Sequence, residues 1–241
     1  MTAMADTPSY ASKAASLYDE AYAARYRTHD DGLADSVPYL AFVAWLQSAG
    51  AKFTKPVDAL ELGCGTGRYF SALTGVRTLV GIDASPAMLA LARQPFRADR
   101  ITVERITLVQ GDLLSHEFDA GAFDFIYAIG VLAEHVPLDA ALVARVTRWL
   151  RPNGRFAFST VHPASPSVPR TAGRTLGRLI EPFAPGALRA YLRERLLAGG
   201  LYADEQRVRD LLDRSFAIES LQRFESEAHL HCLCVARKGP R

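Results

Sequence analysis

Residues 57–67 read VDALELGCGTG, a short apolar run that ends in a loop with three alternating glycines. The apolar run predicts a buried strand, and Gly63, Gly65 and Gly67 let the backbone turn tightly and approach a ligand at the start of a helix. Asp83 closes the next predicted strand, where its carboxylate can accept hydrogen bonds from a ribose diol. The glycine loop and Asp83 together predict a nucleoside-binding site.

The segments that follow this motif alternate between predicted strands and predicted helices. Strands are predicted at 77–82, 106–110, 123–129 and 155–161, and helices from the glycine loop to Leu73, from Pro86 onward and over 138–150. Ser85 is the expected N-cap of the second helix, and residues 152–154 (Pro-Asn-Gly) are the expected turn before the last of these strands. This alternation predicts an α/β fold with a doubly wound parallel sheet.

The alternation breaks after the strand at 155–161. Residues 163–203 are punctuated by prolines and contain a helical piece near 187–197, a length that is typical of a substrate lid. A helix is predicted at 204–214. The strands predicted at 216–223 and 227–237 are joined by a short link, which indicates an antiparallel hairpin at the edge of the sheet.

Length and composition indicate a single soluble globular domain. The chain has 241 residues, of which 49% are hydrophobic and 22% are charged, and its net charge is +2. A charge this small gives no general attraction to nucleic acid or to an anionic membrane. No basic segment followed by an apolar stretch opens the chain, and the apolar run at 39–46 is too short to span a bilayer.

Three cysteines without a metal-ligand spacing make no disulfide framework, so the expected location is the cytoplasm. Within the single domain we expect four parts. They are an N-terminal helical cover at 1–50, a cofactor-binding core at 51–162, a substrate lid at 163–203, and a last helix with a terminal hairpin at 204–241.

The spacing of the glycines decides between two classes of adenosine-bearing cofactor. A dinucleotide site uses the pattern G-x-G-x-x-G, whereas this loop reads G-x-G-x-G and has Arg68 where the third glycine of a dinucleotide site belongs. Arg68 receives no other role. A nicotinamide-dependent oxidoreductase is therefore the alternative rather than the preferred interpretation.

Five motifs in a fixed order carry a resemblance to a known family. They are ALELGCGTGRYF, LVGIDASPAMLALAR, LVQGDLL, FDFIYAIGVLAEHV and LRPNGRFAFST, and on them residues 57–161 resemble the class I S-adenosylmethionine-dependent methyltransferases. The resemblance implies a Rossmann-like seven-stranded sheet with strand order 3-2-1-4-5-7-6 and only the last strand antiparallel. The hairpin at 216–237 corresponds to the family's final two strands.

The resemblance also implies S-adenosyl-L-methionine as the cofactor and S-adenosyl-L-homocysteine as the product. It places Gly63, Cys64, Gly65 and Gly67 along the methionine half with Glu61 behind them, Asp83 at the ribose hydroxyls, Ala84 and Met88 beside the adenine, Asp112 at the adenine amino group with Leu113 next to it, and Ile129 at the methionyl portion. Cys64 needs no thiol chemistry there, because the backbone of the loop makes the contacts.

An acceptor of high pKa, such as a phenol or an ammonium, must lose a proton when it is methylated, often to a side chain near neutral pKa. His135 follows the fourth strand and His162 follows the fifth, at the edge where parallel sheets bind ligands, and either is a candidate base. Glu134 is a third candidate.

The N-terminal cover and the lid are expected to form the acceptor chamber. Tyr18, Tyr22 and Tyr26 are spaced four apart, which predicts three rings along one helical face, and Arg25 beside them could reach a carboxylate. The lid contains Arg170, Arg174, Arg178, Arg189, Arg193 and Arg195, which are interpreted as solvated side chains unless one or two meet an anionic acceptor.

The histidines and cysteines near the end of the chain resemble a set of metal ligands but are not expected to act as one. His229 and His231 should face one side of a strand and Cys232 and Cys234 the other, so we expect no metal site.

After the fourth strand the chain lacks the Pro-Pro-aromatic element of nucleic-acid amino methyltransferases. It also lacks the pair of glutamates that protein arginine methyltransferases carry in a hairpin loop, because only Glu134 follows the strand. We therefore expect a small-molecule acceptor methylated at a nitrogen or oxygen atom, with no nucleic-acid or membrane partner and with a monomer and a homodimer both open. C-methylation, a macromolecular acceptor and a non-catalytic methyltransferase-like binding module are the alternatives.

Overall fold

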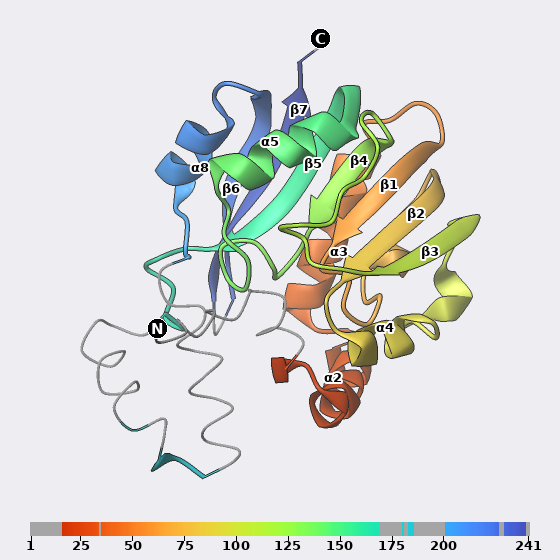
Figure 1. Cartoon of the computed structure of the whole chain (residues 1–241), viewed down its shortest axis with the longest axis vertical. Helices are drawn as coiled ribbons and strands as arrows, with labels where there is room; N and C mark the ends of the chain where they lie inside the picture. Colours follow the sequence, from red (N-terminus) through yellow and green to blue (C-terminus); the bar gives the residue numbers. More distant parts are fainter. Residues whose placement is uncertain are drawn as a thin grey trace, which may run out of the picture.

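The computed structural model describes residues 16–33, 35–168, 180, 183–185, 201–226 and 229–239. Its strands form one seven-stranded sheet in the order β3-β2-β1-β4-β5-β7-β6 (Figure 1). The strands are β1 (Val57–Leu62), β2 (Val76–Asp83), β3 (Arg105–Gln110), β4 (Phe123–Ala128), β5 (Leu150–Val161), β6 (Phe216–Glu225) and β7 (Leu230–Lys238). Neighbours pair in parallel except at β7, which is antiparallel to both β5 and β6. The expected fold and strand order are confirmed.

Helices cover both faces of the sheet. Figure 1 shows α5 (Ala140–Trp149) and α8 (Glu205–Leu212) in front of the sheet and α3 (Val37–Gly50) behind it. The buried side chains form two clusters, one that includes residues of α5 and α8 and another that includes residues of α3. Every residue of β1 is buried, as expected of a central strand that is covered on both sides.

Short polar side chains begin the helices of the core. The Ser85 hydroxyl accepts the Met88 N–H at 3.1 Å and so caps α4 (Pro86–Ala92), which confirms the expected N-cap. Asp139 caps α5 and Asp204 caps α8 in the same way. These caps fix where each helix leaves the sheet edge that carries the glycine loop.

The segment after the glycine loop differs from the prediction. The expected helix to Leu73 is replaced by turns and a single 3-10 turn, η1 (Phe70–Ala72). Gly67 and Gly75, with φ of +74° and +68°, bracket the segment, and neither conformation continues an α-helix. Between these two glycines the chain forms turns and η1, and β2 begins at Val76.

The start of β5 also differs from the prediction. The strand begins at Leu150, directly after α5, rather than at Arg155 after a free turn. Asn153 has φ +64°, and the pairing of β4 with β5 shifts register there, so the expected turn becomes an irregularity within a longer strand.

Several expectations lie outside the described residues or are not decided by the fold. The helical piece near 187–197 and the six arginines of the lid (Arg170, Arg174, Arg178, Arg189, Arg193 and Arg195) fall in parts that the structure does not describe. The division of the chain into four parts stays a prediction. Among the described residues, no helix combines the length and the apolar character needed to cross a membrane.

Two glycines with similar backbone conformations provide a test of the loop geometry. A Cβ on Gly67 would lie 2.6 Å from Phe70 Cε2 and 2.9 Å from Pro95 Cβ, whereas a Cβ on Gly75 would meet nothing within 4 Å. We expect Gly75→Ala to lower the free energy of unfolding by about 1–2 kcal/mol, the cost of a left-handed alanine. Gly67→Ala should lose about 1–3 kcal/mol more, because Phe70 is fully buried and cannot move aside. Urea unfolding of both variants measures this difference, and equal losses would contradict the close packing described for Gly67.

Candidate functional site

The carboxyl end of β1 carries the glycine loop, and the loop is fixed by its own backbone. Gly63, Gly65 and Gly67 all have positive φ, at +69°, +52° and +74°. The N–H groups of Gly63 and Cys64 both donate to the carbonyl of Ile82, at 2.8 and 3.0 Å, so the loop is held against the end of β2. This is the tight turn that the sequence predicts.

Asp83 joins the glycine loop to the start of α4. Its Oδ2 accepts the Gly65 N–H at 2.8 Å and its Oδ1 accepts the Ser85 N–H at 2.9 Å. Burial raises the pKa of this carboxyl, and the backbone donors oppose that rise. A carboxylate has about four acceptor sites, so Asp83 can also accept from a ligand hydroxyl.

The residues expected around the adenine lie at the same edge. Met88 is buried, and its Cε would lie 3.5 Å from a Cβ on Gly65, which places its side chain over the glycine loop. The Gly111 N–H donates to the Asp83 carbonyl at 3.0 Å, so the loop that begins there with Asp112 runs beside the end of β2. Leu113 is buried in this loop.

The remaining expected positions surround this edge. Ala84 lies between Asp83 and the α4 cap and is partly buried, as is Ile129 directly after β4. Cys64 packs so closely under the loop that a Cβ on Gly81 would lie 2.9 Å from its Sγ. Burial raises the pKa of the Cys64 thiol, so a thiolate is disfavoured there.

Glu61 is a buried acid beneath the glycine loop. It is 2% exposed, and Tyr127 Oη donates to its Oε2 at 2.7 Å. Burial raises its pKa to about 8, with the nearby Asp83 charge adding to the effect and Arg68 opposing it. Near neutral pH this carboxyl is therefore mostly protonated.

Arg68, to which the sequence analysis assigned no role, forms an ion pair with Asp30 that holds the end of the glycine loop against α2. Asp30, fully buried on α2 (Glu20–Leu33), accepts Arg68 Nε at 2.6 Å on Oδ1 and the Thr66 hydroxyl at 2.5 Å on Oδ2. The Arg68 guanidinium also lies 4.6 Å from the ring centre of Tyr26. No pattern in the sequence signals this pair, because its members lie far apart in the chain.

The three tyrosines cluster, but not along one helix. Tyr22 and Tyr26 lie on α2 and stack with ring centres 5.7 Å apart, whereas Tyr18 lies in a bend before α2 begins at Glu20. Tyr18 still contacts Tyr22 edge to face at 4.7 Å. The expectation of a single helical face is thus wrong for Tyr18. Arg25 is exposed, and its guanidinium lies 5.7 Å from the Tyr22 ring centre.

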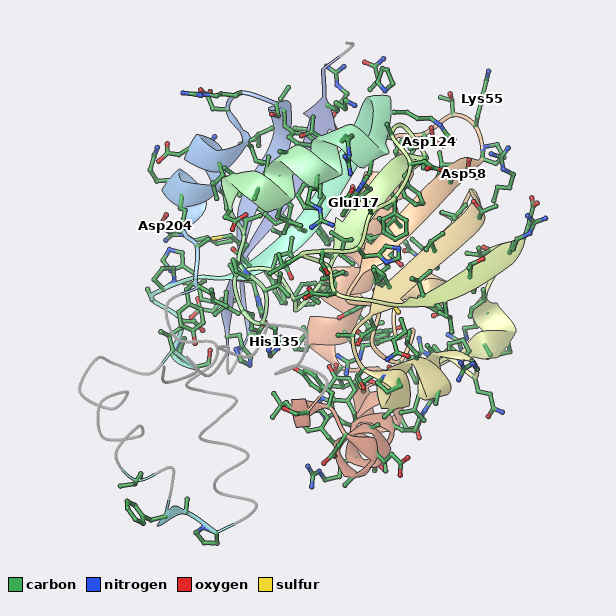
Figure 2. The ribbon with its side chains drawn as sticks, in the orientation of Figure 1. Lys55, Asp58, Glu117, Asp124, His135 and Asp204 are labelled. Atoms are coloured by element: carbon green, nitrogen blue, oxygen red, sulfur yellow. The ribbon has the colours of Figure 1, made fainter. Side chains whose placement is uncertain are left out.

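Tyr18 and His135 are brought together across the edge of the sheet. Tyr18 Oη lies 3.0 Å from His135 Nε2, and the Tyr18 carbonyl accepts the Ser85 hydroxyl at 2.6 Å. Tyr18 therefore spans from the start of α4 to the loop after β4. In Figure 2, His135 lies at the edge of the sheet opposite to Asp58 and Asp124, which mark the amino ends of β1 and β4.

The environment of His135 suits a neutral imidazole. Burial lowers its pKa to about 4, so the ring is uncharged near neutral pH. Glu134 Oε1 lies 3.8 Å from His135 Nε2, close enough to interact with a proton that the ring accepts.

His162 has different partners. Its Nδ1 accepts the Ala164 N–H at 3.0 Å, which in the neutral ring leaves the proton on Nε2, 3.4 Å from Glu205 Oε2. Glu205 is also held by Arg223 through two hydrogen bonds. His162 is thereby engaged in a hydrogen-bonded group between β5, β6 and α8.

The same group contains the one set of three potential metal ligands found among the described residues. Ligand atoms of His162, Glu205 and Cys232 lie within 4.8 Å of one another. Three features oppose a metal: the Nε2 lone pair is used by a proton, Arg223 neutralises Glu205, and burial raises the pKa of Cys232 to about 11.

The second pattern of potential ligands is divided between the faces of β7. The ring centres of His229 and His231 lie 5.5 Å apart, and His231 contacts Phe42 of α3 behind the sheet. Cys234 belongs to the core cluster on the opposite face. These four side chains therefore do not converge on one point.

Comparisons with known proteins agree with this geometry. Residues 59–154 match the family model described as a methyltransferase domain. The chain is 36% identical over 111 residues to the ubiquinone biosynthesis O-methyltransferase of Nitrosococcus oceani, covering 43% of each protein. It is 30% identical over 101 residues to the sterol 24-C-methyltransferase of Kluyveromyces lactis, covering 41% of this chain and 26% of that relative. These matches thus span less than half the length of either relative.

Solved structures share the fold at low sequence identity. Magnesium protoporphyrin IX methyltransferase from Synechocystis, crystallised with S-adenosylmethionine, superposes with a TM-score of 0.65 at 14% identity, covering 98% of this chain and 100% of that one. This likeness extends over the sheet and the helices on both of its faces.

The raised pKa of Glu61 predicts how stability depends on pH. The folded protein keeps a proton with a pKa of about 8, whereas the ordinary value is 4.5, so between these values folding retains a proton that the unfolded chain has lost. The stability contributed by the neutral acid is complete at the acidic end and falls as pH rises, by at most about 1.4 kcal/mol per pH unit. We expect Glu61→Gln, which cannot titrate, to gain stability relative to the wild type from about pH 5 to about pH 9.

Urea unfolding across this pH range measures the effect, with Glu104→Gln at an exposed position as the matched control. The control should follow the wild type throughout. Parallel pH profiles for Glu61→Gln and the wild type would show that Glu61 is ionised in the folded protein.

Proposed function

We propose that the chain is a class I methyltransferase, which transfers a methyl group from S-adenosyl-L-methionine to a nitrogen or oxygen atom of a small-molecule acceptor. The observation that carries the proposal is the glycine loop at the end of β1, whose three positive-φ glycines are tied to Asp83 by the Gly65 N–H. Arg68 supports this cofactor over a dinucleotide, because it occupies the position of the third dinucleotide glycine and is committed to Asp30.

The donor groups of the site fit the parts of this cofactor. We assign the glycine loop (Gly63, Cys64, Gly65 and Gly67, with Glu61 beneath) and Ile129 to the methionine portion, Asp83 to the ribose hydroxyls, Ala84 and Met88 to the flanks of the adenine, and Asp112 with Leu113 to its amino edge. The position of Asp83 beside the glycine loop and the position of Met88 over that loop support these assignments.

The chemistry of transfer asks little of the protein beyond alignment and proton removal. The sulfonium of the bound cofactor supplies a methyl group and a good leaving group for in-line displacement. The acceptor atom forms its bond to the methyl carbon as the carbon–sulfur bond breaks, and the acceptor's proton passes to a base. His135 is the proposed base, because it lies beside Tyr18 at the open edge of the sheet and its partly buried ring is uncharged near neutral pH, although the lowered pKa makes it a weaker base than a free imidazole.

The acceptor would approach from the side of the tyrosines. Tyr18, Tyr22 and Tyr26 form a continuous aromatic cluster whose first member touches His135, and Arg25 lies at its exposed end. An acceptor with an aromatic or apolar body suits such a surface. C-methylation, a macromolecular acceptor and a non-catalytic binding module are the alternatives.

The first experiment is a calorimetric titration with S-adenosyl-L-homocysteine, with NADH as the comparison ligand. We expect micromolar binding of the first and none of the second. Asp83→Ala should weaken the binding by about 1–3 kcal/mol, or about 5-fold to 150-fold, because a ligand hydroxyl loses its partner. Asp99→Ala, at an exposed acid on η2 (Ala98–Arg100), should bind like the wild type. Binding of NADH alone would overturn the proposed cofactor and favour an oxidoreductase.

The second experiment decides between the two histidines. In an assay of S-adenosyl-L-homocysteine formation against a panel of amines and phenols, His135→Asn should lower the rate by about 100-fold or more, the usual contribution of a general base. Its affinity for the cofactor product should stay within about twofold of the wild type, because no proton is moved in that step. A larger loss of rate in His162→Asn would place the base at the end of β5 instead. Tight binding without turnover on this panel would contradict transfer to a small amine or phenol and would favour the alternatives, which are C-methylation, a macromolecular acceptor and the binding module.

A further inference from the structure

The loop between β3 and β4 has a conformation that its own residues only partly explain. Asp112 Oδ1 accepts the Leu114 N–H at 2.8 Å, and the Asp112 carbonyl accepts the N–H groups of Ser115 and His116 at 3.1 and 2.7 Å. These bonds close a tight turn and leave the carbonyls of Leu114 and His116 without a donor from the turn itself. Asp112 Oδ2 is left for another partner.

Arg145 of α5 supplies the missing donors. Its Nη1 donates to the Leu114 carbonyl and its Nη2 to the His116 carbonyl. The side chain is 16% exposed, its guanidinium lies 5.0 Å from the ring centre of Trp149, and its Nε lies 3.5 Å from Glu117 Oε1. One planar group thus grips two carbonyls of the turn that holds Asp112 and Leu113.

The charge of Arg145 also bears on Asp112. Burial lowers the pKa of the Arg145 guanidinium, and the Asp112 carboxylate acts against that effect. The two groups therefore interact electrostatically although no hydrogen bond joins them. Glu117, labelled in Figure 2 beside α5, adds a second acid on the outer side of the same arginine.

We propose that Arg145 is a positioning residue for adenine recognition, which it performs by fixing the turn that presents Asp112 and Leu113 to the amino edge of the base. The inference rests on the proposed function, because Asp112 is assigned to the adenine there. Arg145 itself touches no ligand in this proposal. Its effect on binding should appear only for ligands whose recognition depends on Asp112.

The geometry requires arginine rather than any cation. The planar guanidinium holds its N–H donors in a fixed arrangement that reaches both carbonyls of the turn, those of Leu114 and His116. The ammonium of a lysine is a single charged group on a flexible chain and does not hold two donors in such a fixed arrangement. Arg148 lies three residues further along α5 and provides a matched comparison. Its side chain is 52% exposed and pairs with Glu117, the same acid that Arg145 approaches.

The test compares two ligands and two variants by calorimetry. The ligands are S-adenosyl-L-homocysteine and its inosine counterpart, in which an oxo group replaces the adenine amino group. The wild type should prefer the adenine ligand at least about 10-fold, because a carboxylate that accepts from an amino group is left facing an oxygen. In Arg145→Lys the preference should fall to about threefold or less through weaker binding of the adenine ligand alone, whereas Arg148→Lys should keep it.

Each other outcome overturns the inference in a distinguishable way. Equal weakening of both ligands in Arg145→Lys would show a general structural role, and an unchanged preference would show that the turn holds Asp112 without Arg145. A wild type that binds both ligands equally would remove Asp112 from adenine recognition, and a wild type that binds neither would refute the proposed cofactor. If Arg145→Lys does not fold, as judged by its urea transition, Arg145→Gln is measured in its place, with the same expected loss of preference.

Discussion

The buried carboxylate of Asp30 is the constraint on which the candidate site depends. It accepts from Arg68 and Thr66, which flank Gly67 at the end of the glycine loop, and it belongs to the helix that carries Tyr22 and Tyr26. Removing one member of a buried ion pair typically costs about 3–5 kcal/mol, because the other charge is left without compensation. The loop that is assigned to the cofactor and the helix that is assigned to the acceptor are therefore held as one unit.

The other anchors of the site work on the same principle, since each polar side chain fixes a backbone turn at the carboxyl edge of the sheet. Asp83 joins the glycine loop to α4, Ser85 joins α4 to the Tyr18 segment, and Arg145 joins α5 to the turn after β3. Parallel strands bring these turns to one edge but do not by themselves set their conformations. The side-chain hydrogen bonds fix the conformations of these turns, so the donors and acceptors at this edge are held in place.

His135 and His162 show how surroundings separate two residues of the same type. Both follow a strand at the open edge, and sequence position alone gives them equal standing. His162 is engaged by a backbone N–H and by Glu205, whose charge Arg223 balances, whereas His135 is buried beside a tyrosine hydroxyl and has a lowered pKa. The lowered pKa weakens His135 as a base, so its place beside Tyr18 and the lack, among the described residues, of a backbone N–H on its ring nitrogens, rather than its basicity, favour it in the proposed reaction.

The sequence by itself determined the strands of the parallel sheet, the glycine loop and the cap of α4, because these depend on short patterns read within a few residues of one another. The strand order followed from the resemblance of five motifs to a known family. It misplaced the helix after Gly67, the start of β5 and the position of Tyr18, where the folded backbone departs from the local pattern of the sequence. Asp30 with Arg68, Tyr18 with His135, and Arg145 with the turn after β3 were decided only by the tertiary structure. Each of these contacts joins residues that lie far apart along the chain, and only the folded sheet brings them within the few ångströms over which hydrogen bonds and ion pairs act.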